Sequence, residues 1–123
     1  MYRIPLDTMW SDLDYMKNMA IFTVDEENYP PKEMRDFLNE SSLHYIPLID
    51  VGVSLEDMIA VKLGKDMNIF IKSHYGTSYE GIVWPGKVHY VDYLHPNASS
   101  YWSSQLDRLY KVIPFSGVWL DMN

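Results

Sequence analysis

The chain has no cysteine among its 123 residues, so disulfide bonds and cysteine-ligated metal sites are excluded. Positive charge is also scarce, with 10 Lys and Arg against 17 Asp and Glu and a formal net charge of −7. Proteins that bind nucleic acid use basic surfaces to neutralise phosphates, so this balance argues against a nucleic-acid partner. No apolar run approaches the roughly 20 residues that cross a bilayer, which predicts no membrane segment in this chain.

What the chain does have is apolar and aromatic content, with 47% hydrophobic and 15% aromatic residues. That composition is typical of a folded domain, and the length suits a single one. Three short, mostly apolar segments are typical of strands buried on both faces of a parallel sheet. They are Ile4–Trp10, His44–Ile49 and Gly117–Leu120.

Two segments have helical patterns. Pro30-Pro31 gives a start signal for a helix over Lys32–Glu40, because proline is tolerated in the first turn. Asn97 is expected to cap a second helix over Ala98–Val112, which Pro114 ends. An apolar stripe runs along this second helix at Trp102, Leu106, Leu109 and Ile113.

The alternation of strands and helices predicts an α/β fold with about three parallel strands and two helical crossovers. The stretch Val51–His95 is too long for a plain loop. It contains the segments Asn68–Lys72 and Ile82–Tyr93 and is expected to be an insertion that carries a small β-hairpin.

Each predicted strand is followed by a carboxylate: Asp12 with Asp14, then Asp50, then Asp121. The carboxyl ends of parallel strands open on one face, and in a (β/α)8 barrel that face holds the active site. The Asp12-Leu13-Asp14 triplet also has the form that nucleotide-sugar transferases use to hold a metal, but a plain acidic loop is the favoured interpretation. The histidines lack the spacing of a zinc hydrolase helix, and no metal site is predicted.

Three blocks of sequence resemble the catalytic barrel of glycoside hydrolase family 31, the α-glucosidase and maltase group. The blocks are Ile4–Met16, Tyr45–Ser54 and Phe115–Asn123, and Val83-Trp84-Pro85-Gly86 lies between the second and the third. They occur in the family's order and span nearly the whole chain. One departure is Val51, which stands where the family usually has proline.

The resemblance implies a retaining mechanism with two carboxyl groups, one a nucleophile and the other an acid/base. Asp121 matches the nucleophile, which attacks the anomeric carbon of the sugar. Asp12 matches the acid that binds sugar hydroxyls, and Asp50 matches a carboxylate near the floor of the site. The pocket lining is matched by Leu48, Trp84, Trp119 and Met122. No metal and no organic cofactor is implied.

The resemblance also implies that residues 1–123 are a segment of a TIM barrel, truncated at both ends. The acid/base and the remainder of the barrel are expected to lie outside this chain, so the chain alone is expected to be inactive. The implied substrates are maltose-like oligosaccharides with terminal α-linked glucose, and the implied location is lysosomal or secreted. A non-enzymatic carbohydrate-binding role and another family 31 specificity, such as that of an α-xylosidase, are the alternatives.

Overall fold

A three-stranded parallel sheet forms the centre of the molecule, in a computed structural model that describes residues 5–122. The strands are β1 (Thr8–Ser11), β2 (His44–Ile49) and β6 (Trp119–Leu120), in the order β1-β2-β6. Thr8 pairs with His44, and Leu48 pairs with Trp119. The predicted parallel sheet is therefore confirmed, with β2 between two edge strands.

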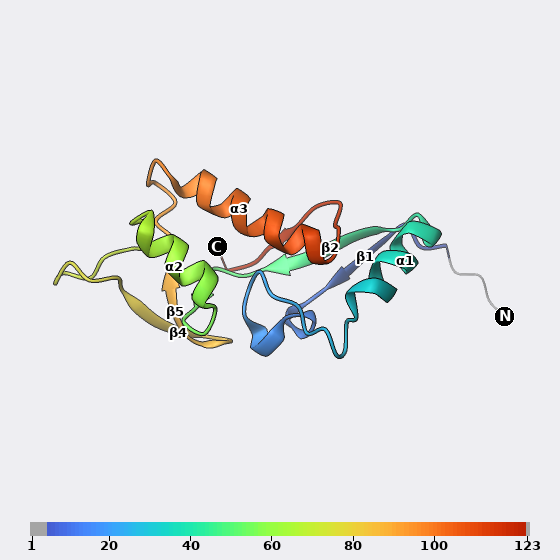
Figure 1. The fold of residues 1–123 in the computed structure, drawn as a ribbon, viewed down its shortest axis with the longest axis horizontal. Coiled ribbons are helices and arrows are strands. Elements are labelled where there is room, and N and C mark those ends of the chain that lie inside the picture. The colour runs from blue at the N-terminus through green and yellow to red at the C-terminus, as the bar shows by residue number, and fades with distance from the viewer. Residues whose placement is uncertain (1–4, 123) are drawn as a thin grey trace.

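Helices α1 (Pro31–Ser41) and α3 (Ala98–Val112) lie along this sheet (Figure 1). Side chains alternate across a strand, so Tyr45 and Ile49 of β2 point to the same face, and both are buried. The guanidinium of Arg35 on α1 donates to the carbonyl of Val112 at the end of α3, over 2.7 Å. The sheet and these two helices are called the barrel segment below.

The opposite face of the parallel sheet is open in the described part of the chain. Thr8, Trp10, Ile46 and Trp119 line a hollow of about 330 Å³ on this face. The rings of Trp10 and Trp119 meet edge to face, with their centroids 5.2 Å apart. Trp10 nevertheless keeps 62% of its surface exposed.

The insertion, residues 51–95, carries a second sheet whose strands are antiparallel. Its order is β3-β5-β4, made of β3 (Gly52–Ser54), β5 (Gly86–Tyr90) and β4 (Glu80–Val83). Figure 1 shows this sheet and helix α2 (Met58–Asp66) gathered at the end of the molecule far from the N-terminus. Gly64 of α2 lets the ring of Phe70 lie directly on the helix, because a Cβ there would meet Phe70 Cζ at 2.2 Å.

Helix α2 and strand β3 are absent from the sequence-based prediction, which placed only a hairpin in the insertion. Two large apolar side chains, Met58 and Ile59, are exposed in the first turn of α2 and blur its apolar stripe. The predicted hairpin is present as β4 and β5, joined through Trp84 and Pro85.

The strand and helix boundaries also shift. The first strand begins at Thr8, where pairing with β2 starts, and part of the predicted Ile4–Trp10 strand, Ile4 itself, lies outside the described residues. Asn97 is the residue before α3, as predicted, but its side chain makes no capping hydrogen bond. Among residues 5–122, no helix is both long and apolar enough to cross a membrane.

Candidate active site

A pocket of about 350 Å³ opens where the parallel strands end. Its lining comprises Asp12, Leu13, Asp14, Met19, Leu48, Asp50, Trp84 and Asp121. Five of the seven side chains that the sequence assigns to a site are in this set. The pocket therefore joins residues that are more than 100 positions apart in the chain, as the parallel topology requires.

Asp12 follows the last residue of β1 and begins a short 3-10 helix, η1 (Leu13–Tyr15). Its carboxylate accepts a hydrogen bond from the backbone N–H of Leu13 at 2.8 Å. Asp12 itself keeps an extended backbone as the N-cap, whereas Leu13 and Asp14 are helical. Both carboxylates still line the pocket, and Leu13 lines it as well.

Asp50 follows β2 and is the most buried carboxylate of the pocket, with 3% of its surface exposed. Burial raises the pKa of Asp50 above its ordinary value, and the charges of Asp121 and Asp12 raise it further. The backbone N–H of Val51 donates to Asp50 Oδ1 at 2.7 Å and opposes this shift. The three carboxylates at the strand ends are thus close enough to interact electrostatically.

Asp121 follows β6 and is exposed at the edge of the pocket. Its Oδ1 accepts a hydrogen bond from the backbone N–H of Met122 at 3.0 Å. Met122 adopts a left-handed backbone conformation with φ of 60°, which few residues with a side chain adopt. This turn fixes one oxygen of the carboxylate against the backbone at the end of the strand.

Leu48 and Trp84 supply apolar surface beside the carboxylates. The carbonyl of Leu48 accepts a hydrogen bond from the hydroxyl of Tyr15 at 2.7 Å. Burial raises the pKa of Tyr15, so this phenol stays a neutral donor over the physiological range. Trp84 comes from the β4–β5 turn of the insertion, and 64% of its surface is exposed. An exposed indole beside carboxylates offers an apolar face for stacking.

Two sequence-predicted residues, Trp119 and Met122, are not among the residues that line this pocket. Trp119 precedes Asp121 by two positions in the chain and lines the hollow on the open face of the sheet instead. Met122 lies beyond the strand with 72% of its surface exposed. Asn123, the end of the third resemblance block, lies outside the described residues.

Three pocket residues are additions to the predicted set: Leu13, Asp14 and Met19. Leu13 and Asp14 directly follow Asp12 in the chain, and the 3-10 helix η1 places both of them at the pocket. Met19 has a left-handed backbone with φ of 58°, next to Asn18 with φ of 51°. No sequence signal marks that turn, because methionine rarely adopts this conformation.

The pocket holds several carboxylates and an aromatic wall but no cationic side chain among the residues that line it. Such a lining repels anionic ligands and suits neutral ligands with many hydroxyl groups, because carboxylates accept hydrogen bonds from hydroxyls. In the part of the chain that the structure describes, no group of three or more histidines or acids is arranged to hold a metal ion.

Comparison with known families identifies the class of protein. The family model described as "Glycosyl hydrolases family 31 TIM-barrel domain" matches residues 1–123. The chain belongs to glycoside hydrolase family 31, and its parallel sheet with flanking helices is a segment of the family's TIM barrel.

Individual relatives agree with this assignment. "Lysosomal acid alpha-glucosidase" of Tetrahymena pyriformis is 40% identical over 98% of this chain and 14% of that protein. "Probable alpha/beta-glucosidase" of Arthroderma benhamiae is 39% identical over 98% of this chain and 15% of that protein. The chain therefore spans about one seventh of the length of these curated relatives.

A solved structure gives the same result for the fold. The family 31 alpha-glucosidase from Bacteroides thetaiotaomicron is 30% identical to this chain and superposes with a TM-score of 0.77. The match covers 98% of this chain and 21% of that protein. The insertion and the barrel segment are both within this coverage.

Proposed function

We propose that this chain forms part of the catalytic barrel of a retaining α-glucosidase, with Asp121 as the nucleophile. The observation that carries the proposal is that Asp12, Asp50 and Asp121 follow three different strands and line one pocket. Family membership supplies the retaining chemistry. The relatives' names, which refer to alpha-glucosidase and alpha/beta-glucosidase, support the substrate class.

The proposed reaction divides into two displacements. A carboxylate oxygen of Asp121 attacks the anomeric carbon, the glycosidic C–O bond breaks, and the leaving oxygen takes a proton from an acid/base residue. Water then attacks the glycosyl-enzyme and releases glucose, while the acid/base takes back a proton. We assign the acid/base to residues beyond these 123, as the family resemblance implies.

The other pocket residues hold the sugar. Asp12 accepts hydrogen bonds from sugar hydroxyls, and Asp50 supports the floor of the pocket beside Leu48. Trp84 stacks on the apolar face of a sugar ring. For Trp119 and Met122 we propose indirect roles, because they flank Asp121 in the chain without lining the pocket.

The proposed substrate is a maltose-like oligosaccharide with a terminal α-linked glucose. A lysosomal or secreted location is proposed from the resemblance, and the lysosomal name of the Tetrahymena relative supports it. A carbohydrate-binding role without catalysis, or specificity for an α-xyloside, would appear as distinct outcomes in the experiment below.

The nucleophile can be tested without a general acid, because fluoride leaves an activated glycosyl fluoride with little protonation. We expect 5-fluoro-α-glucosyl fluoride to form a covalent adduct on the peptide that contains Asp121, detected by mass spectrometry after proteolysis. The Asp121→Asn variant should not be labelled. The chain alone should turn over an aryl α-glucoside little or not at all, because general acid catalysis contributes about 10²–10⁴-fold.

Other results would change the assignment. An adduct on Asp12 or Asp50, or no adduct at all, would contradict Asp121 as the nucleophile. Saturable binding of maltose without any labelling would favour the carbohydrate-binding role. Labelling by the xylosyl analogue in preference to the glucosyl one would favour an α-xylosidase.

A further inference from the structure

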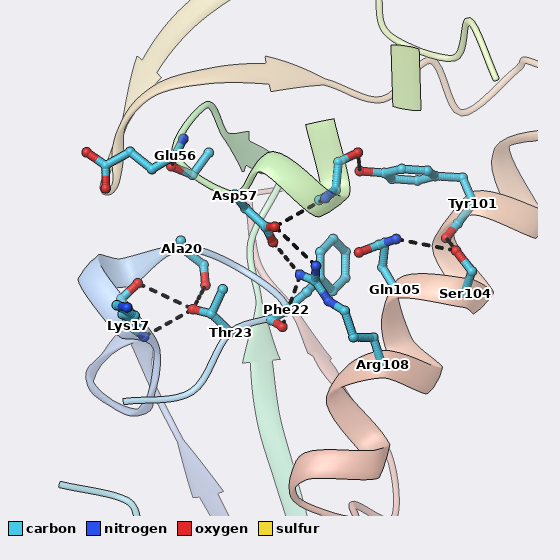
Figure 2. A network of polar contacts seen from close by, with 12 residues as sticks. Lys17, Ala20, Phe22, Thr23, Glu56, Asp57, Tyr101, Ser104, Gln105 and Arg108 are labelled. Carbon is cyan, nitrogen blue, oxygen red and sulfur yellow. Dashed lines mark hydrogen bonds and ion pairs between the residues drawn. The ribbon is translucent and has the colours of Figure 1, made fainter. Parts of the chain in front are cut away.

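A partly buried ion pair ties the insertion to the barrel segment (Figure 2). Arg108 on α3 donates to Asp57 through two nitrogens, Nη1 to Oδ1 at 3.1 Å and Nη2 to Oδ2. The side chain of Asp57 is 7% exposed and that of Arg108 is 25% exposed. Asp57 is also the N-cap of α2, because its Oδ1 accepts from the N–H of Ala60 at 3.1 Å.

The same guanidinium reaches a third segment. Arg108 Nη2 donates to the carbonyl of Phe22 at 3.3 Å. Phe22 has a left-handed backbone with φ of 66°, and it follows closely on the left-handed turn at Asn18 and Met19. A donor at the Phe22 carbonyl therefore holds a strained loop in place. Figure 2 shows the loop and the start of α2 on either side of the guanidinium.

The two segments that Arg108 joins both contribute side chains to the lining of the pocket. The loop carries Met19, and the insertion carries Trp84, and both line the pocket with the carboxylates. Arg108 and Asp57 themselves are not among the lining residues. A second hydrogen bond also joins α3 to the insertion. The hydroxyl of Tyr101 on α3 donates to the carbonyl of Ala60 on α2 at 3.1 Å.

We propose that Arg108 and Asp57 are positioning residues that set where Trp84 and Met19 lie relative to the strand-end carboxylates. The role of Trp84 as a sugar-stacking wall rests on the proposed function, whereas the positioning itself does not. The fork of the guanidinium is essential, because it binds two carboxylate oxygens and a carbonyl at once, and a lysine ammonium has no such planar geometry.

The experiment replaces tryptophan with 5-fluorotryptophan in the 123-residue chain and records 19F NMR spectra without any sugar. The four resonances, from Trp10, Trp84, Trp102 and Trp119, are assigned by single Trp→Phe variants. Trp102 packs on Phe22 with ring centroids 5.1 Å apart and reports on the ion pair's own surroundings. Trp10 and Trp119 report on the parallel sheet.

Three variants test the pair. Arg108→Met removes the charge and keeps an apolar stem, and Arg108→Lys keeps the charge without the fork. Asp57→Asn keeps an oxygen that can cap α2 and removes the carboxylate. The control is Lys111→Met on the same helix, where Lys111 pairs with Asp107 at 2.6 Å on the exposed surface.

We expect the Trp84 resonance to shift and broaden in all three test variants, while Trp10 and Trp119 keep their positions. Lys111→Met should leave all four resonances unchanged. The proposal is overturned if Trp102 shifts while Trp84 does not, since the pair is then a local brace only. If Arg108→Met unfolds the chain, the spectrum of Asp57→Asn is used instead. A shift of Trp102 without a shift of Trp84 in that spectrum overturns the proposal in the same way.

A sugar titration separates this proposal from the function. Wild-type chain is titrated with glucose, and the Trp84 resonance is followed. One outcome is that the Trp84 resonance shifts in the variants and yet does not change when glucose is added to the wild type. That result supports the positioning role and counts against the sugar pocket. A response to glucose that is equally strong in wild type and Arg108→Met contradicts the positioning role.

Discussion

The sheet of the insertion has a helix of its own, whereas the parallel sheet of the barrel segment leaves one face exposed. In the insertion, Val53, Val88 and Phe70 are buried at 2% exposure or less. In the barrel segment, Trp10 on the open face keeps 62% of its surface exposed. The insertion thus buries an apolar core, with Ile82 and Trp84 of its hairpin exposed at 79% and 64%, while the barrel segment presents an open hollow that further barrel strands cover in a complete (β/α)8 barrel.

The two regions also deliver pocket residues by different means. The barrel segment supplies Asp12, Asp50 and Asp121 from strand ends, whose positions follow from sheet register. The insertion supplies Trp84 from a turn, whose position depends on how the whole insertion docks. The chemistry of the proposed reaction therefore comes from the barrel segment, and the shape of the pocket depends on both.

The largest effect is expected from breaking the core of the insertion. Phe70→Ala removes a ring that contacts Gly64, His89 and Tyr101, and such truncations cost about 3–5 kcal/mol. Hydrogen exchange should then accelerate throughout β3, β4 and β5 and much less in β1 and β2. Phe37→Ala is the control, because Phe37 is 48% exposed on α1. Equal acceleration in both sheets would show that the regions unfold as one unit.

A smaller effect is expected at the junction of the two regions. A Cβ at Gly52 would lie 2.6 Å from Val83 Cγ2, so Gly52→Ala forces the hairpin away from β3. Overpacking of this kind costs about 1–3 kcal/mol, measured by denaturant unfolding. Adding Val83→Ala should restore part of the loss.

The control for this junction is Gly117→Ala. A Cβ there meets only the end of the Ile46 side chain, at 3.3 Å, which can move aside. If Gly117→Ala lowered the free energy of unfolding as much as Gly52→Ala, the close approach of the hairpin would not be the cause of the destabilisation. Absence of rescue by Val83→Ala would mean the same.

A pH-dependent effect is expected at Asp50. Its pKa is raised in the folded state, so ionisation at neutral pH opposes folding, and this penalty disappears as the pH falls below the unfolded value. Asp50→Asn should therefore raise the melting temperature at pH 7, and the gain should shrink on acidification. The asparagine oxygen can keep the bond from Val51. A difference in melting temperature that is constant with pH would contradict the raised pKa of Asp50, whose largest cause is burial.

The smallest effects are expected from exposed ion pairs in either region. Lys32 pairs with Asp36 on α1, and Lys62 pairs with Asp66 on α2, each at 2.6 Å on the surface. Such pairs contribute little because water and salt screen them. Lys32→Met and Lys62→Met should leave the melting temperature unchanged within error. A clear loss from one of them only would show that surface charge distinguishes the two regions.

The barrel segment was largely predictable from the sequence. Short apolar segments that end in carboxylates indicated the parallel strands, and the helix from Ala98 to Val112 has the predicted bounds. The expected burial of the strands on both faces holds for most of β2 but not for β1, which is largely exposed. The site in this region was predictable for the same reason, because residues after parallel strands meet at one edge. Asp12, Leu48, Asp50 and Asp121 all line the pocket.

The insertion was less predictable because its pattern is local and weak. Helix α2 has exposed Met58 and Ile59 and a glycine at position 64, each of which lowers a helical prediction. Nothing in the sequence distinguishes its capping residue, Asp57, from an ordinary acidic residue on the surface. Only the fold shows that Arg108, 51 residues later, binds it.

By itself, the sequence determined the family, the presence of three parallel strands and the carboxylates at their ends, because these depend on periodicity and on motifs of neighbouring residues. The tertiary structure alone decided that Trp119 faces the open side of the sheet, that Met19 and Trp84 form walls of one pocket, and that Arg108 links the segments that carry them. Contacts of that kind join residues far apart in the chain, and no local pattern specifies which distant side chains will meet.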